Sequence, residues 1–239
     1  MIPGPGRLLP VLVAAVGLTL VTGCSSGASV SDPSTVAQVK TRLLAPGMAP
    51  GFSPEPRTQQ SARQSARARP FVPPRGRPDQ VCSRLATPAS FVPDATLSSG
   101  QSIAAADPQL YGPFAPSWFE GIDVYPGTEA ATMVTTLTRM IGRCGHFLLS
   151  AAGPGSAPAP ASESAARLPG LGDQALYVTV RVRTTTPGLF QAHDWVLIRS
   201  DRTLIWIDDQ SVAAEAVGNG HDQLTLRLAR DAWRHFSAS

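Results

Sequence analysis

The sequence predicts an α+β domain in which an antiparallel meander sheet packs against a central helix and a C-terminal helix. Strict alternation of apolar and polar residues over 176–183 is typical of a strand, and apolar runs at 195–199 and 204–207 indicate two more. Apolar residues spaced by three and four positions over 128–144 and again over 222–236 indicate helices. Strands followed and interrupted by helices in this way favour an α+β arrangement.

The last three predicted strands form the meander. The residues Ser200-Asp201-Arg202 separate the second and third of these strands by a tight turn. In the first strand Val178 and Val180 alternate with Thr179 and Arg181, which predicts a sheet with one buried face and one solvated face. An earlier strand is predicted over 118–125, and the stretch before it, up to about Tyr111, is polar.

The central helix begins after the turn formed by Pro126-Gly127. Thr128 is placed to cap its N-terminus, and Glu129 lies in the positively polarised first turn. One face of the helix carries an apolar stripe, which must pack on the core: Ala130, Val134, Leu137, Ile141 and Cys144. In the C-terminal helix, which Asp222 could cap, Leu224, Leu228, Ala232, Trp233 and Phe236 supply a broad apolar face.

The N-terminus carries an export signal that ends in a lipoprotein cleavage box. A basic Arg7 and a short apolar run precede Val21-Thr22-Gly23-Cys24, so small residues stand directly before a cysteine. The apolar run is shorter than the roughly twenty residues that a spanning helix needs. We therefore expect cleavage after residue 23 and acylation of Cys24, which would hold the chain at the outer face of the cytoplasmic membrane.

The remaining cysteines support an oxidising compartment. With Cys24 acylated, Cys82 and Cys144 remain as one pair, for which a disulfide is the default in an exported protein; two buried free thiols are the alternative. Val81 and Leu85 place Cys82 in a short helical turn, and Cys144 ends the apolar stripe. We therefore expect the segment around residue 82 to lie under the central helix.

Composition divides the chain into five parts. We expect a signal peptide at 1–23, a flexible spacer at 24–30, a short helix and turn at 31–50, a disordered Arg/Pro-rich segment at 51–78 and the α+β domain at 79–239. The short helix is expected to start at Asp32-Pro33 and to pack on the domain, with a free amphipathic arm as the alternative. Residues 153–166 are expected to form an Ala/Pro/Ser-rich loop, and 168–173 a tight turn into a strand.

Charge and motifs give no catalytic or metal site. The formal net charge is only +3, and the arginine excess is concentrated in 51–78, so nucleic acid is not an expected partner, although contact of that segment with anionic headgroups is possible in principle. No Gly-x-Ser-x-Gly elbow is present, and the histidines are scattered (His146, His193, His221 and His235). Asp208-Asp209 could bind a cation or act as paired carboxylates, but such a pair more often solvates a strand end. We predict no cofactor.

The order of elements resembles a family of mycobacterial lipoproteins of the sensor-domain type, which are similar to the extracellular domain of the PknH serine/threonine kinase. The resemblance rests on the lipoprotein box, on Ile122-Asp-Val-Tyr-Pro-Gly-Thr-Glu-Ala-Ala131 with its helix ending at Arg143-Cys144, on the turn 168–173, and on the closing meander and helix. It implies an α+β domain with disulfides and a cleft for an unidentified ligand. The single cysteine pair and the Arg/Pro-rich insertion depart from the kinase pattern and leave a sister family of uncharacterised lipoproteins as an alternative.

These observations predict a non-catalytic, membrane-anchored module of the cell envelope that binds a ligand or acts as a sensor. Its partners would be the membrane, through the lipid, and an unidentified small ligand, lipid or envelope protein. The alternatives are an accessory protein that docks an envelope complex and, less favoured, an envelope hydrolase. An apolar cleft would favour the ligand-binding hypothesis, and a flat exposed apolar patch would favour docking.

Overall fold

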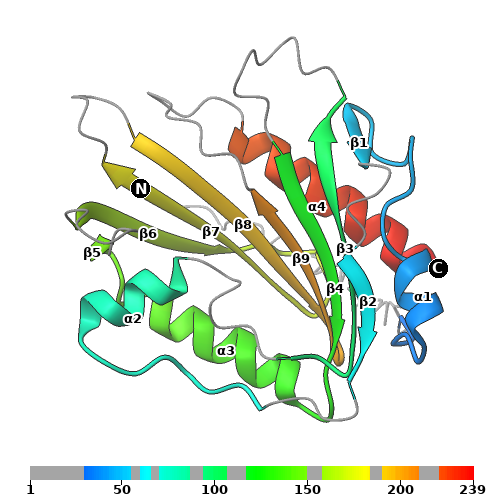
Figure 1. Ribbon diagram of the computed structural model, residues 1–239, viewed down its shortest axis with the longest axis horizontal. Coiled ribbons are helices and arrows are strands. Elements are labelled where there is room, and N and C mark those ends of the chain that lie inside the picture. Colours follow the sequence, from blue (N-terminus) through cyan, green and yellow to red (C-terminus); the bar gives the residue numbers. More distant parts are fainter. Residues whose placement is uncertain are drawn as a thin grey trace, which may run out of the picture.

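The computed structural model describes residues 30–54, 60–65, 70–86, 94–106, 117–149, 158–183, 190–209 and 221–239. Its architecture is a single antiparallel sheet with helices on both faces (Figure 1). The predicted α+β meander with a central helix and a C-terminal helix is therefore confirmed. The predicted signal peptide, spacer and acylated Cys24 lie outside the described residues.

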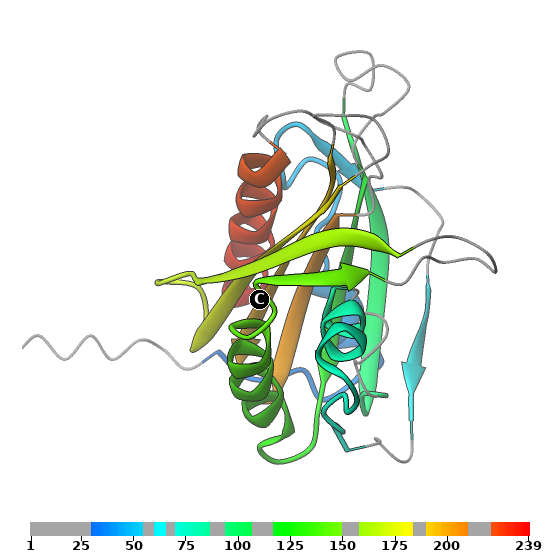
Figure 2. The same ribbon diagram turned by 90° about the vertical axis from the view of Figure 1, so that its left-hand side faces the viewer.

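Nine strands form the sheet, in the order β1-β3-β4-β9-β8-β7-β6-β5, with β2 also paired to β3. Strands β5 to β9 run back through the sheet as a meander until β9 pairs with β4. The sheet is strongly twisted, so that β6 and β4 point in very different directions (Figure 2). The strand bounds are β1 Phe52–Pro54, β2 Gln60–Gln64, β3 Leu97–Ala105, β4 Ser117–Val124, β5 His146–Leu149, β6 Ala159–Arg167, β7 Gln174–Arg183, β8 Phe190–Ser200 and β9 Thr203–Asp209.

Both faces of the central strands are buried, which corrects the prediction of one solvated face. On β8 the consecutive residues Trp195, Val196, Leu197 and Ile198 are all fully buried and belong alternately to two separate core clusters. The strands are antiparallel, yet their apolar residues are continuous because helices cover both faces. The prediction of one solvated face relied on the alternation in β7. That strand lies nearer the edge of the sheet, so its pattern does not represent the central strands.

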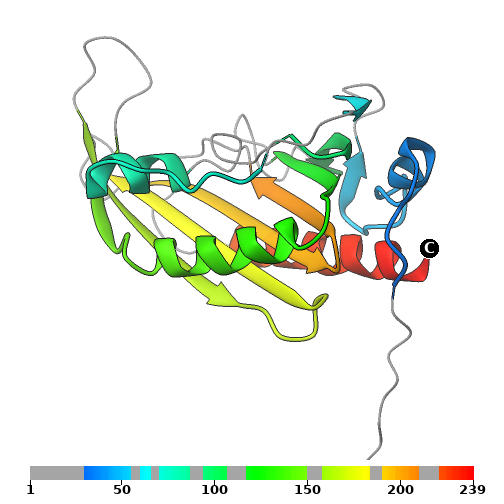
Figure 3. The same cartoon turned by 90° about the horizontal axis from the view of Figure 1, so that it is seen from below.

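One face is covered by α2 (Pro78–Leu85) and α3 (Glu129–Ile141). The predicted stripe of α3 is buried on this face, together with Met133. Thr128 is the N-cap residue, but its side chain makes no capping hydrogen bond, and Glu129 instead accepts a bond from the backbone N–H of Phe71. Seen from below, α3 lies across one face of the strands and α4 lies behind them (Figure 3).

The other face is covered by α1 (Val36–Thr41) and α4 (His221–Ala238). Thr35 caps α1 by accepting a bond from the N–H of Gln38, so the helix begins later than the predicted Asp32-Pro33 start. The segment packs on the domain as expected, since Val39 and Leu44 are buried in the same cluster as the apolar face of α4. The domain core therefore extends to residues before 79.

The prediction of disorder over 51–78 is wrong where the structure describes this segment. Strands β1 and β2 both pair with β3, and the side chains of Phe52 and Phe71 are buried in the two cores. The segment is rich in proline and arginine and has no apolar periodicity, which is why disorder was predicted. Its backbone nevertheless gains hydrogen bonds from a neighbouring strand. Pro78 then opens α2 at the first helical position.

Two further strands fall in stretches that were predicted to be irregular. Strand β3 lies in the polar stretch before Tyr111, and β6 occupies most of the loop predicted over 153–166. Both are rich in Ser, Ala or Gly, which have low intrinsic strand preference. Each pairs on both sides, β3 with β1, β2 and β4 and β6 with β5 and β7, so tertiary pairing overrides local preference.

The disulfide between Cys82 and Cys144 is present, as predicted, with an S–S distance of 2.10 Å and a Cα–Cα distance of 5.4 Å. It joins α2 to the residues just after α3, and both side chains are buried. Further bonds hold α2 to β5, since Ser83 Oγ donates to the carbonyl of Leu148 at 3.0 Å and Asp79 Oδ1 accepts from the N–H of Leu148 at 3.2 Å. The early segment therefore lies beside the central helix, and α2 is fixed to the sheet edge.

Candidate functional site

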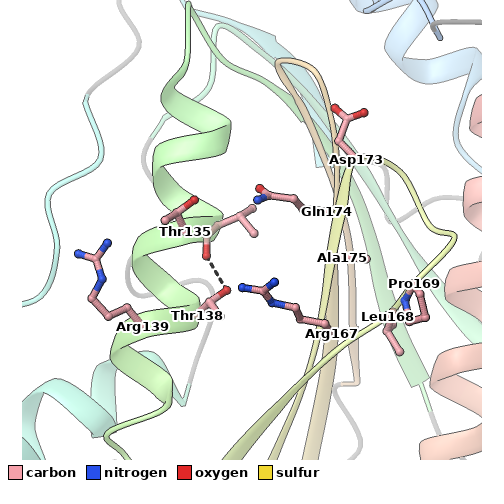
Figure 4. A pocket seen from close by; sticks show the side chains of 10 residues that line it. Thr135, Thr138, Arg139, Arg167, Leu168, Pro169, Asp173, Gln174 and Ala175 are labelled. Carbon is pink, nitrogen blue, oxygen red and sulfur yellow. Dashed lines mark hydrogen bonds between the residues drawn. The ribbon is translucent and has the colours of Figure 1, made fainter.

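A groove lies between α3 and the turn that joins β6 to β7 (Figure 4). It encloses a cavity of about 520 Å³, which lies within the range of roughly 300–1,000 Å³ typical of small-ligand sites. We call it the α3–β7 groove. Its lining residues come from positions 134–139 of α3 and from both sides of the turn: Val134, Thr135, Thr138, Arg139, Arg167, Leu168, Pro169, Asp173, Gln174 and Ala175.

The groove combines polar groups with an apolar base. Arg167 projects from the end of β6 towards Thr138, and Gln174 projects from β7 towards Thr135, whereas Arg139 is turned to the outer side of α3 (Figure 4). The hydroxyl of Thr138 donates to the carbonyl of Val134 at 2.8 Å, so its oxygen remains available as an acceptor. Such a lining can hold a ligand that has both an apolar part and a polar or charged part.

The turn 168–173 has the glycine-dependent form that the sequence predicted. Gly170 and Gly172 adopt φ values of 81° and 57°, and a Cβ on Gly172 would approach the carbonyl oxygen of Arg199 to 2.2 Å. Asp173 closes the turn against the β8–β9 turn, because its Oδ2 accepts from the N–H of Asp201 at 2.7 Å and lies 3.0 Å from Arg199 Nη1. The wall of the groove is thereby tied to the central strands.

A second, smaller cavity of about 340 Å³ lies between α1 and β3. Beside it the fully buried Glu120 accepts hydrogen bonds from the N–H of Leu44, at 3.1 Å, and from Gln101 Nε2, at 2.6 Å. Burial raises the pKa of Glu120 to about 7 although both bonds lower it. Glu120 connects α1 to the sheet, so we assign it a structural role. The cavity is lined by Lys40, Thr41, Leu43, Leu44, Ala45, Pro46, Ser99, Gly100 and Gln101.

One of the scattered histidines lies in a defined polar arrangement. His193 Nε2 is 2.6 Å from Asp208 Oδ1, and its Nδ1 is 2.9 Å from the carbonyl oxygen of Ala86 at the end of α2. Both partners are acceptors, so only the doubly protonated imidazolium donates to both. Burial lowers the pKa of His193, but its hydrogen bond and charge interaction with Asp208 outweigh burial, and the pKa is raised. With both nitrogens engaged, His193 is not positioned to activate a nucleophile.

Glu163, on β6, is a buried acid beside His193. Glu163 is 4% exposed, and neither of its carboxyl oxygens has a hydrogen-bond partner among the described residues. Burial raises the pKa of Glu163 to about 8, although the positive charge of His193 lowers it. The group is therefore mainly protonated at neutral pH, and nothing in the sequence around it, which is rich in Ala and Ser, indicated a buried acid.

The other sequence candidates are separated by the fold. Asp208 and Asp209 point to opposite faces of β9, because Asp208 pairs with Trp195 of one core and Asp209 with Trp118 of the other. They do not act as paired carboxylates, and the expectation that both would solvate a strand end is wrong, since Asp209 is buried. His146 is exposed on β5, and His235 Nε2 lies 3.0 Å from the carbonyl oxygen of Thr41.

Within the described ranges, no group of three or more His, Cys, Asp or Glu side chains is arranged to hold a metal ion. Among the same residues no helix is long and apolar enough to cross a bilayer. The large apolar side chains that are exposed there are Met48, Val72 and Leu148, which lie on three different segments.

Comparison with known proteins identifies the fold and no family. No family model matches the sequence, and no curated protein matches it. Among solved structures, the fold is similar to that of the extracellular domain of PknH from Mycobacterium tuberculosis, with a TM-score of 0.52 and 8% sequence identity, over 87% of this chain and 99% of that chain. At this identity the likeness concerns the fold alone, and it agrees with the architecture that the sequence resemblance implied.

Proposed function

We propose that the protein is a non-catalytic module of the cell envelope, anchored to the membrane by an acylated Cys24, which binds a small ligand in the α3–β7 groove. The observation that carries this proposal is the groove itself. It has the volume of a small-ligand site and combines polar side chains with an apolar base. The domain of PknH that shares the fold is extracellular, which agrees with an exported location.

The groove also favours ligand binding over the docking alternative. A docking protein would be expected to present a continuous apolar patch, whereas Met48, Val72 and Leu148 are scattered single exposures. An envelope hydrolase is disfavoured by His193, which has a carboxylate partner in Asp208, because its second nitrogen is engaged by the carbonyl of Ala86. No observation favours a second function strongly enough for us to propose it.

The ligand proposal is tested by filling the groove. Thr135→Trp is expected to place an indole in the cavity and abolish the copurifying ligand in native mass spectra of protein extracted from its own envelope. Thr132→Trp is the matched control, because Thr132 is also an exposed threonine of α3 but does not line the groove. Ligand that is retained equally by both variants, or absent from the parent protein, would contradict the assignment of the groove.

The anchor is tested separately by Cys24→Ala. Removal of the acylated thiol should shift the exported protein from the detergent phase to the aqueous phase, because buried acyl methylenes each contribute about 0.8 kcal/mol of membrane affinity. Phase partitioning of whole-cell extracts measures the shift, with Cys82→Ala as a control that keeps Cys24. Unchanged partitioning of the Cys24 variant would overturn the lipoprotein assignment.

A further inference from the structure

The described chain begins at the same end of the sheet as the α3–β7 groove. Asp32 Oδ2 accepts from Arg202 Nε at 2.9 Å and Asp32 Oδ1 accepts from Thr203 Oγ1 at 2.8 Å, which fixes the N-terminal segment to the β8–β9 turn. In Figures 2 and 3 the first described residues and the β6–β7 turn lie towards the same side of the molecule. The groove therefore opens beside the point at which a membrane tether would leave the domain.

The tether is short. Asp32 follows Cys24 by eight positions, and a fully extended chain of that length spans at most about 28 Å. Asp32 is held on the β8–β9 turn, and that turn is bonded through Asp173 to the wall of the groove. An acylated Cys24 would consequently keep Asp32 within this distance of the lipid headgroups, with the groove at the same end of the domain.

The charge at this end suits an anion. Asp32 is paired with Arg202, and Asp173 is paired with Arg199. This leaves two guanidinium groups without an ion pair to any described residue, Arg167 in the groove and Arg139 on the outer side of α3. One exposed carboxylate at this end, that of Asp201, likewise has no ion pair to a described residue. Two guanidinium groups and one carboxylate give a local excess of positive charge.

The side chains around Arg167 add polar groups that can bind a phosphate. A guanidinium binds a phosphate through two parallel N–H donors. Gln174 accepts from Arg199 Nε through its oxygen, at 3.1 Å, so its amide N–H groups remain to donate into the groove beside Thr135. The apolar residues Val134 and Leu168 in the lining could contact the glycerol and the first methylenes of a lipid.

We propose that the α3–β7 groove binds the headgroup of an anionic phospholipid of the membrane to which the chain is tethered. This inference rests on the proposed function, since it takes both the anchor and the groove from it. Its consequence is that the domain lies on the bilayer in one orientation, with the β6–β7 and β8–β9 turns towards the lipid.

The test uses the mature acylated protein in vesicles of phosphatidylcholine, with or without phosphatidylglycerol. Amide hydrogen exchange of residues 134–139 and 167–175 is expected to slow by about tenfold when phosphatidylglycerol is present, and the protection should weaken at high salt. Arg167→Gln should abolish the protection. Arg230→Gln is the matched control, because Arg230 is an exposed arginine of α4 with no ion pair to a described residue, and it should leave the protection unchanged.

Each other outcome has a distinct meaning. Protection that also appears when soluble sn-glycerol 3-phosphate is added to phosphatidylcholine vesicles would overturn the assignment to a membrane lipid and indicate a free phosphate ligand. Protein that stays with both kinds of vesicle without any change in exchange would overturn this inference, yet leave the anchor and the native mass spectrometry test intact. Protein that does not remain with the vesicles would overturn the anchor and this inference together.

Discussion

Removal of the Cys82–Cys144 disulfide is expected to lower the melting temperature of the protein by roughly 10 °C. The two cysteines are 62 residues apart in sequence, and for a loop of this length the chain-entropy model gives about 4 kcal/mol of stabilisation. For a chain of about 200 residues, each kcal/mol corresponds to a shift of roughly 2–4 °C. The effect is large because the bridge closes a long loop between α2 and the end of α3.

The measurement compares thermal unfolding of the oxidised protein with that of a Cys82→Ala, Cys144→Ala double variant. The double variant serves as its own control, since a reductant should lower the melting temperature of the parent protein and leave that of the variant unchanged. Free alkylation of both cysteines in the exported protein without a reductant would contradict the pairing. So would a melting temperature that a reductant does not change.

The disulfide was predictable because two periodic signals agreed on it. Cys144 ends the apolar stripe of α3, and Val81 and Leu85 place Cys82 on a buried helical face, so each thiol was directed towards the core by local pattern alone. The same reasoning predicted β7, β8 and β9, in which apolar residues are dense. Local pattern succeeded where the side chains themselves determine the burial.

Local pattern failed where pairing determines the structure. Strands β2, β3 and β6 contain mainly Ser, Ala, Gln, Arg and Gly, and they are ordered by backbone bonds to other strands rather than by local preference. The residues 51–78 looked like a linker for this reason, although β1 and β2 pair with β3. The burial of both sheet faces was also missed, because it depends on which helix covers which face.

The candidate site had no sequence signal. The α3–β7 groove joins residues around 134–139 to residues around 167–175, and neither segment contains a motif typical of a binding site. Arg167 directly precedes the turn 168–173, and no pattern in the sequence singled it out. The turn itself was predicted correctly from its glycines, but its role as the wall of a groove appears only when α3 is placed across β7.

The free energy of unfolding is expected to fall by several kcal/mol as the pH rises from about 5 to about 8. Burial raises the pKa of Glu163 to about 8, of Glu120 to about 7 and of Asp123 to about 6, from ordinary values of 4.5, 4.5 and 3.8. In this pH range the unfolded chain has already released these protons, whereas the folded protein still holds them. Stability is therefore complete below the unfolded pKa values and is lost as the pH rises through the folded ones.

His193 contributes in the same direction. Although burial lowers its pKa, the bond to Asp208 raises it above the ordinary value of 6.5, so the stabilisation from the imidazolium is fully present below that value. It is lost as the pH rises through the raised pKa, when His193 can no longer donate to both Asp208 and the carbonyl of Ala86. The end of α2 should loosen in the same pH range.

Urea unfolding at a series of pH values measures the pH dependence of the free energy of unfolding. Glu163→Gln isolates the contribution of Glu163, which is the largest. Glu163 has the largest of the three shifts, and each pKa unit corresponds to about 1.4 kcal/mol, so its ionisation opposes folding at pH 8 by on the order of 3–5 kcal/mol. The variant should match the parent near pH 5 and exceed it in stability at pH 8. Asp201→Asn is the control. It removes an exposed carboxylate, and asparagine tolerates the same positive φ, so the pH profile of stability should stay unchanged. A stability that stays level or rises between pH 5 and pH 8 in the parent would show that these acids are not buried as the structure places them.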